Sequence, residues 1–173
     1  LGDDTAEYEG RLTLNPFSHL DLMGSIMILV AGFGWAKPVP VNPLNFRRNG
    51  ITMRGGMALT AAAGPLSNLI LGLIFFLICK IALVNPALPY ALVQVTLMVS
   101  QINIMLAVFN LLPIPPLDGS KVVFSFLPKK YYWKLMRYER YGMILLLVLS
   151  YFGFADGFIT RGIVTVFEAL VNL

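Results

Sequence analysis

The sequence is short of charge. Lys, Arg, Asp and Glu make up 13% of the 173 residues, whereas hydrophobic residues make up 57%. A typical soluble domain carries about 25% charged residues. So few charges cannot cover a soluble globule of this size, and the high hydrophobicity excludes intrinsic disorder. The composition therefore favours an integral membrane protein.

Cysteine and histidine occur once each, as Cys79 and His19. Cys79 has no partner for an internal disulfide, and its apolar surroundings predict a packed, inert thiol. A catalytic zinc ion usually takes three protein ligands, with histidine prominent among them. His19, Asp21 and Asp118 would therefore make a poor self-contained zinc site, and we interpret His19 as a hydrogen-bonded histidine near the membrane surface.

The formal net charge is +4, but the basic clusters flank long apolar runs, where Lys and Arg set membrane topology. Nucleic acid is therefore not an expected partner. Two apolar runs, 57–84 and 90–112, are long enough to span a bilayer. The turn between them has no basic residue, whereas the flanking loops are basic. The positive-inside rule then predicts a core helical hairpin over 57–112 with both ends at the cytoplasmic face.

Other apolar segments are shorter. Residues 142–159 are expected to form a third span, and 162–173 a short helix at the surface. The run 20–35 falls below the roughly 20 residues of a spanning helix, which indicates a short or re-entrant segment. Residues 10–15 alternate as a short strand would, and the prolines of 37–43 favour extended backbone. The predicted fold class is an all-α membrane protein: a polytopic helical bundle with a short extended or β segment near the membrane surface.

The stretch 110–119, NLLPIPPLDG, is the one most indicative of chemistry. Its prolines break the helix, and broken backbone at membrane depth must be buried in protein or line a watery cavity. An acid there, Asp118, is costly in lipid and is a candidate metal or substrate site. The alternative is a helix end with an interfacial acid. Gly119 suggests positive φ or a close approach.

Gly64, Asn68 and Gly72 recur every four residues and so share one helix face. Small residues let a second helix approach closely, and Asn can hydrogen-bond across such a contact. We interpret this face as a packing face. The alternative is that it receives a substrate helix.

Four stretches occur in a specific order: LGDDTA…GRLTLNP..H.D..G over 1–24, WAKPVPVNP over 35–43, AGPLSN over 63–68 and NLLPIPPLDG over 110–119. Together they resemble the site-2 protease family of intramembrane zinc metalloproteases, most of all its compact bacterial and archaeal members. The resemblance extends from Leu1 to about Lys121.

The resemblance implies residue roles. Asp118 matches the aspartate of the L-D-G motif (117–119), which is the third zinc ligand in the family. Asn110 matches an asparagine thought to position the substrate or stabilise the oxyanion. Pro38, Val39 and Pro40 match a membrane-associated strand or loop proposed to pair with an unwound substrate segment. Asn68 would belong to the substrate-binding face.

In the family a helix carrying H-E-x-x-H supplies two zinc-binding histidines and the glutamate base. No H-E-x-x-H occurs in this sequence, and in family members that helix comes just before the position of Leu1. We therefore expect residues 1–173 to be a partial protease domain, truncated on its N-terminal side. This fragment is expected to be inactive and to lack zinc, whereas the intact protein would hold one zinc ion.

The resemblance thus implies a zinc endopeptidase that cleaves transmembrane segments of membrane proteins. Its expected partners are a substrate transmembrane helix and the lipid bilayer. It is expected to be a multi-pass cell-membrane protein with its active site near the cytoplasmic face. Alternatives are a non-catalytic scaffold or pseudoprotease and, more remotely, a transporter. Substrate identity and oligomeric state do not follow from the sequence.

Overall fold

The computed structural model describes residues 1–31, 34–47 and 50–153, together with seven later residues: 157, 161, 162, 164–166 and 168. The chain forms two compact units, 1–57 (unit 1) and 58–173 (unit 2), and each is described by itself. All regular structure in the described ranges is helical, and these ranges contain no strand. The predicted helical class is therefore confirmed.

Unit 1 consists of short helices separated by irregular chain: α1 (Thr5–Tyr8), η1 (Pro16–His19), α2 (Leu22–Ala31) and η2 (Pro43–Asn45). The two 3-10 helices start in the same way. The side chains of Asn15 and Asn42 each accept a 3.1 Å hydrogen bond from the backbone N–H two residues later. A proline follows each asparagine at the first helical position, where a missing N–H costs nothing.

The apolar run 20–35 folds as a short helix after which the chain turns back. The ten residues of α2 extend about 15 Å, roughly half of a 30 Å hydrocarbon core. A Cβ on Gly24 would overlap the carbonyl of Trp35, and a Cβ on Gly34 would overlap the carbonyl of Gly24. Only glycine permits this approach of two backbones. The segment is therefore too short to span, as expected, and its entry into a membrane stays a prediction.

The strand predicted over residues 10–15 is wrong. The alternation predicts Leu12 and Leu14 inside and Arg11 outside, but Arg11 is 7% exposed whereas Leu12 is 73% exposed. A strand needs a ladder partner for its backbone, and no strand lies beside this segment in the described ranges. Residues 34–42 form neither helix nor strand. The extended course of 37–43 as a whole stays a prediction, although Asn42 has extended dihedral angles.

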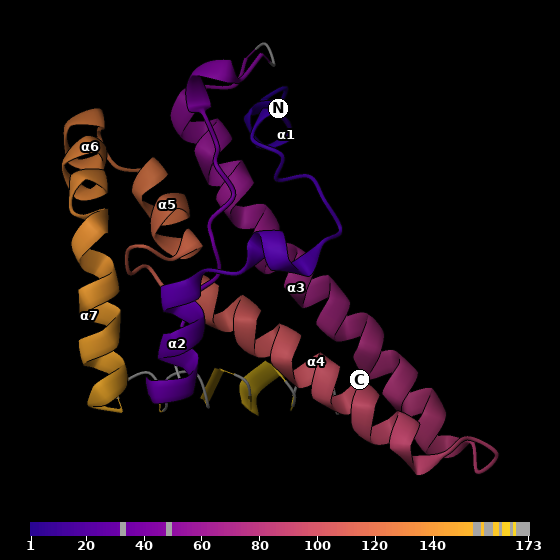
Figure 1. Cartoon of the computed structure of the whole chain (residues 1–173). Helices are drawn as coiled ribbons and strands as arrows, with labels where there is room; N and C mark the ends of the chain where they lie inside the picture. The colour runs from indigo at the N-terminus through magenta and orange to yellow at the C-terminus, as the bar shows by residue number, and fades with distance from the viewer. Residues whose placement is uncertain are drawn as a thin grey trace. The chain divides into compact units, whose positions relative to one another are not determined.

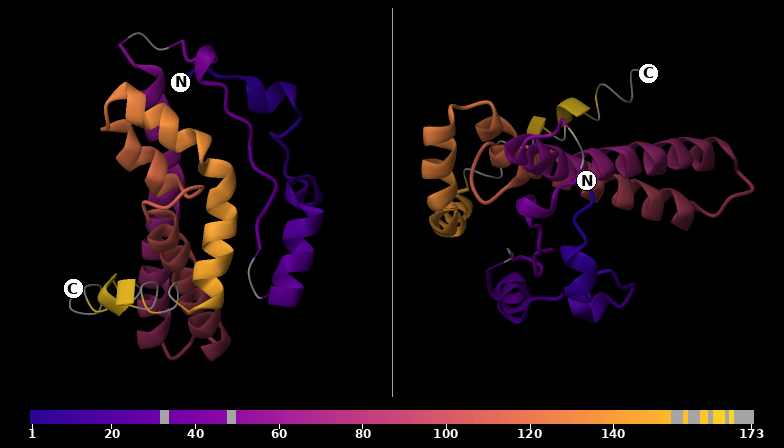
Figure 2. Two further views of the ribbon diagram at one scale, coloured as in Figure 1. Left: turned by 90° about the vertical axis from the view of Figure 1, so that its left-hand side faces the viewer. Right: turned by 90° about the horizontal axis from the view of Figure 1, so that it is seen from above.

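Unit 2 contains the predicted hairpin, formed by α3 (Met53–Val84, whose first turn lies in unit 1) and α4 (Tyr90–Asn110). Figures 1 and 2 show the two helices side by side and antiparallel. The hydroxyl of Ser100 donates to the carbonyl of Gly72 at 2.8 Å, and a Cβ on Gly72 would lie 2.7 Å from the side chain of Ile104. Small residues and a buried hydroxyl thus bring the helices together, as in membrane helix pairs.

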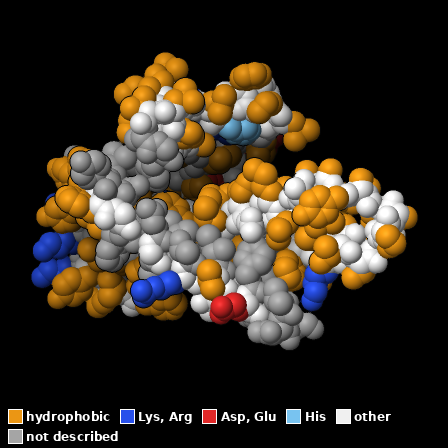
Figure 3. Space-filling model, turned by 90° about the horizontal axis from the view of Figure 1, so that it is seen from below, with side chains coloured by type: hydrophobic (Ala, Val, Ile, Leu, Met, Phe, Trp, Pro, Cys, Tyr) orange, Lys and Arg blue, Asp and Glu red, His pale blue; other side chains and the backbone are white. Residues whose placement is uncertain are grey.

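Both hairpin helices are long and apolar enough to cross a membrane. Only 22% of the most apolar window of α3 and 28% of that of α4 is buried. A core helix of a soluble protein would be mostly buried, so these helices leave apolar side chains outward. Figure 3 shows one side of the molecule, on which hydrophobic side chains outnumber charged ones among the described residues. The lengths, composition and exposure are those of a membrane protein.

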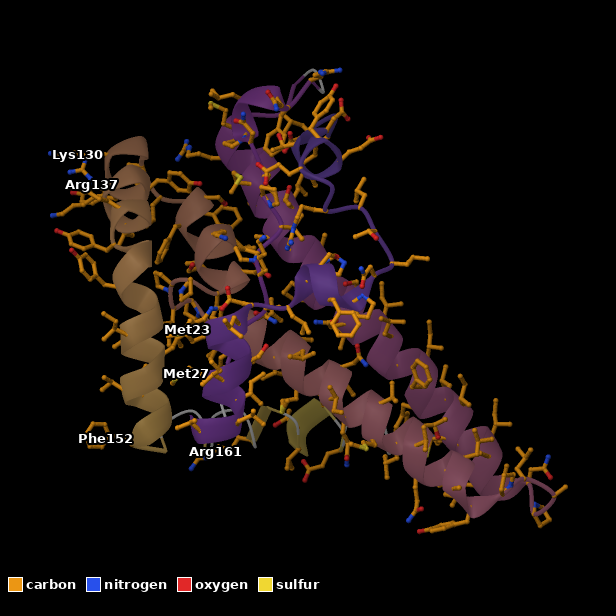
Figure 4. The ribbon with its side chains drawn as sticks, viewed as in Figure 1. Met23, Met27, Lys130, Arg137, Phe152 and Arg161 are labelled. Atoms are coloured by element: carbon orange, nitrogen blue, oxygen red, sulfur yellow. The ribbon has the colours of Figure 1, made fainter. Side chains whose placement is uncertain are left out.

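After the hairpin come α5 (Asp118–Ser125), α6 (Lys129–Arg137) and α7 (Glu139–Tyr151). Lys130 and Arg137 project from α6 on the side away from α5 (Figure 4). The described part of the predicted third span is helical up to Tyr151. Residues 154–156 and 158–160, and most of the predicted C-terminal helix, lie outside the described residues, so both expectations stay predictions.

Candidate functional site

The proline-rich break lies between α4 and α5, where the chain changes direction (Figure 1). Hydrogen bonds between residues close in sequence hold the break in a turn. The N–H of Leu117 donates to the carbonyl of Ile114 at 2.9 Å. The hydroxyl of Ser120 donates to the carbonyl of Leu117 at 2.7 Å. α5 then begins at Asp118, so its carboxylate lies in the first turn. The helix dipole favours a negative charge at this end.

The carboxylate of Asp118 lies against α3. Its Oδ2 atom is 3.2 Å from the position that a Cβ on Gly64 would occupy. Any side chain at position 64 would compete with the carboxylate for this space, because 3.2 Å is tighter than ordinary van der Waals contact. The structure thus joins two motifs, AGPLSN and L-D-G, that the sequence places 54 positions apart (118 minus 64).

Glycines also bring the break into contact with its neighbours. A Cβ on Gly119 would overlap the carbonyl of Leu111 at the end of α4, and a Cβ on Gly142 of α7 would overlap the carbonyl of Pro115. Of the two alternatives predicted for Gly119, the close approach is confirmed, and its φ is not positive. The break therefore packs against α4 and α7, although Leu111 and Pro113 within it are exposed.

The two predicted asparagines lie on the hairpin helices and are half-buried. The Asn110 amide donates to the carbonyl of Leu106 at 2.9 Å, one turn back in its own helix. Its predicted role in positioning the substrate or stabilising the oxyanion stays a prediction. Asn68 lies one turn after Gly64 and therefore on the same face of α3. Its assignment to substrate binding stays a prediction.

The shared face of α3 packs within the chain at both of its glycines: Gly64 contacts the Asp118 carboxylate, and Gly72 contacts α4. This agrees with the packing interpretation of that face. Asn68 lies between them, and the alternative that this face receives a substrate helix stays a prediction.

Two further candidates, His19 and Asp21, have local structural roles in unit 1. The His19 ring nitrogen Nε2 lies 3.0 Å from the carbonyl of Thr13. The Asp21 carboxylate accepts the N–H of Gly24 at 2.8 Å and so caps α2. Neither contact resembles metal ligation, in agreement with the interpretation of His19 as a hydrogen-bonded histidine.

Pro38 and Val39 are exposed and Pro40 is half-buried. Sequence reasoning missed the residue that holds this segment: Arg11, whose guanidinium donates to the carbonyls of Lys37 and Pro38 at 2.8 and 3.2 Å. The only available signal was a single basic residue directly before the alternating Leu12 and Leu14, which the alternation pattern placed on the outside.

Asp3 is a second missed residue. Its carboxylate accepts hydrogen bonds from the N–H of Asn42 and the amide of Asn45, at 2.8 and 3.1 Å. The hydroxyl of Thr5 contributes most to lowering the pKa of Asp3, and the donors from Asn42, Thr5 and Asn45 add to this, so that the pKa falls to about 2. Asp3 therefore stays ionised at any physiological pH.

The residues present do not make a zinc site. Among the described residues, no group of three His, Cys, Asp or Glu side chains lies close enough to hold a metal ion. Asp118 offers one oxygen ligand, whereas catalytic zinc takes three protein ligands. No step of a metal-dependent reaction therefore follows from this chain alone.

The apolar antiparallel hairpin is typical of an integral membrane protein. The acid beside the proline break is a candidate polar site at the end of this hairpin. The profile of peptidase family M50 matches residues 80–150. The Bacillus subtilis protein named "Putative zinc metalloprotease YwhC" is 46% identical over 154 residues, covering 86% of this chain and 68% of YwhC.

Two relatives with the same description match at lower coverage. Rip3 of Mycobacterium tuberculosis is 32% identical over 66% of this chain and 31% of its own length. MJ0611 of Methanocaldococcus jannaschii is 41% identical over 36% of this chain and 31% of its own length. No solved structure matches the chain. The chain belongs to peptidase family M50, the site-2 protease family, which confirms the resemblance seen in its motifs.

Proposed function

We propose that this chain is part of an intramembrane zinc metalloprotease that cleaves transmembrane segments of membrane proteins. The observation that carries the proposal is the contact between the Asp118 carboxylate and Gly64. It places an acid between a helix long enough to span a membrane and a proline-broken turn. An acid in that setting is expensive in lipid and marks a functional site.

Asp118 is the one zinc ligand that we assign to this chain. Zinc, when bound, lowers the pKa of a water ligand to about 7 and polarises a carbonyl. The sequence has one histidine, His19, and no H-E-x-x-H, so the other ligands and the base must come from outside the 173 residues. By itself this chain is therefore proposed to be inactive.

The chain's own residues have roles that do not require the metal. Asn110 keeps its Oδ1 atom for a substrate N–H or a bound water. Asn68 and the segment Pro38–Pro40 are the proposed substrate contacts. A substrate helix must unwind before cleavage, because its carbonyls are engaged in i to i−4 hydrogen bonds.

The proposed location is the cell membrane, with several passes and the site near the cytoplasmic face. Lys130, Lys134 and Arg137 lie within about 60° of one another around α6 at 100° per residue, and all three are exposed. A basic stripe beside apolar helices is typical of the cytoplasmic interface. α2 exposes Leu22, Leu29 and Val30 by more than three quarters each, as a re-entrant segment would.

The test is cleavage of a transmembrane reporter by the full-length protein, with Asp118→Asn compared with the parent. We expect cleavage to fall by at least about 1,000-fold, because losing a catalytic metal removes several kcal/mol of transition-state stabilisation. Asp4→Asn is the matched control, since Asp4 is 43% exposed and, among the described residues, its carboxylate pairs with the exposed Arg47. Normal cleavage by Asp118→Asn would support the alternative of a non-catalytic scaffold.

A further inference from the structure

Residues distant in the sequence form hydrogen bonds with both ends of the segment 37–42, which lies between α2 and η2. At its start, Lys37 donates its N–H to the carbonyl of His19 at 2.9 Å, and the carbonyls of Lys37 and Pro38 accept from Arg11. At its end, the N–H of Asn42 donates to the Asp3 carboxylate at 2.8 Å. Three residues, Val39–Val41, lie between these two hydrogen-bonded ends.

Arg11 is built into unit 1 as a buried donor. Its side chain is 7% exposed, and its Nη1 atom donates to the carbonyl of Ser18 at 2.5 Å. With the bonds to Lys37 and Pro38, one guanidinium ties together three backbone carbonyls. The planar fork of arginine suits this task, and a lysine ammonium does not have the same geometry. Its buried Nε atom finds no acceptor among the described residues, so keeping this side chain inside has a cost.

The middle of the segment has unused hydrogen-bonding groups. No hydrogen bond joins the backbone of Val39, Pro40 or Val41 to any described residue. Proline fixes its own φ near −65° and pushes the preceding residue toward extended or polyproline geometry.

Lys37 and Pro38 both direct their carbonyls to Arg11, and Pro40 has no N–H to satisfy. The N–H and C=O groups of Val39 and Val41 bind no described residue. Val39 is 53% exposed, so the segment can pair with an added strand here.

We propose that Arg11 is a positioning residue that fixes the Pro38–Val41 segment so that Val39 and Val41 present their backbone groups to an unwound substrate segment. This inference rests on the proposed function. It adds that Arg11 sets the position of the substrate-binding segment. Arg11 touches neither the substrate nor the reacting atoms. It acts through the carbonyls of Lys37 and Pro38.

The test measures two properties of the full-length protein in detergent micelles. The first is amide hydrogen exchange of peptides covering 34–45. The second is the cleavage rate, per folded molecule, of a synthetic transmembrane peptide that carries a donor and a quencher. The variants are Arg11→Met, which removes all three bonds, and Arg11→Lys, which keeps a charge that can reach one carbonyl. Arg47→Met is the matched control, because the Arg47 side chain is 73% exposed.

In Arg11→Met the Lys37 amide should exchange at least about tenfold faster. Cleavage should fall roughly 10- to 100-fold, the size of effect that a misplaced substrate produces. Arg11→Lys should lie between Arg11→Met and the parent in both properties, and Arg47→Met should match the parent. Exchange over Gly64–Ser120 should stay unchanged in every variant.

Unchanged exchange over 34–45 would overturn the proposal, and so would faster exchange with parental cleavage. If Arg11→Met fails to accumulate, the comparison of Arg11→Lys with Arg47→Met decides in its place. A parent that cleaves nothing would contradict the proposed function instead, and the exchange of Arg11→Lys would still show whether Arg11 holds the segment.

Discussion

The contacts inside unit 1 differ in kind from the contacts inside unit 2. In unit 2, glycines at positions 64, 72, 119 and 142 let backbone, apolar side chains or a carboxylate approach closely. Unit 1 also has such an approach, between Gly24 and the 34–35 backbone, but its 37–45 segment is held by Asp3 and Arg11, which bind its backbone and side-chain groups from as many as 42 positions away. Close packing of small residues is how helices associate in lipid. Hydrogen bonds from distant side chains suit a segment with no regular structure, because its backbone groups have no partners within a helix or sheet.

The comparison predicts that added volume at the packed glycines of unit 2 has a large effect on its stability. Gly119→Ala would place a Cβ on the Leu111 carbonyl, and backbone cannot move aside as a flexible side chain can. We expect it to lower the free energy of unfolding by about 2 to 3 kcal/mol, the upper range for overpacking. Gly157→Ala is the matched control, because no atom of the described residues lies within 4 Å of a Cβ at that position. Denaturant unfolding in micelles measures both, and equal stability of the two variants would contradict packing by close approach.

Removing a hydrogen bond within unit 2 should have a smaller effect. Ser100 is fully buried, and its hydroxyl donates to the Gly72 carbonyl. Hydrogen bonds between membrane helices contribute about 0.6 kcal/mol on average, so Ser100→Ala should destabilise the hairpin by about that amount. The same unfolding measurement checks it, and a loss of more than about 2 kcal/mol would mean that polar contacts, rather than glycine packing, join α3 and α4.

Unit 1 should instead respond to pH. The pKa of Asp3 is lowered from 3.8 to about 2, so the folded state favours the ionised carboxylate. The stability it contributes is fully present above pH 3.8 and is lost as the pH falls through about 2. With Trp133→Phe as background, Trp35 is the only tryptophan, and its fluorescence should change between pH 4 and 2. Asp3→Asn should abolish this transition, and an identical transition in both proteins would show that Asp3 does not cause it.

The same contrast explains what could be predicted from the sequence. Length and hydropathy predict α3 and α4, because a helix that satisfies its own backbone is the structure an apolar run adopts in lipid. The role of Asp118 was inferred from the broken helix and the motif. Its contact with Gly64 could not be inferred, because it depends on how the chain turns between Leu111 and Leu117.

Unit 1 could not be predicted in this way. Its alternating leucines indicated a strand, but the buried residue is Arg11, whose partners are carbonyls of residues 18, 37 and 38. A local pattern contains no information about partners that far along the chain. Local signals were informative only where the partner is local, as in the Asn–Pro pairs that open η1 and η2.

The central claim is that Asp118 contributes a zinc ligand. The most direct measurement is the zinc affinity of the full-length protein by chelator competition, with Asp118→Ala compared with the parent and Asp4→Asn. Substitution of residues that only hydrogen-bond to the metal ligands typically lowers metal affinity about 10- to 100-fold. Loss of the Asp118 ligand should therefore weaken zinc binding by at least about 100-fold, while Asp4→Asn binds as the parent does. Parental zinc affinity in Asp118→Ala would contradict the account.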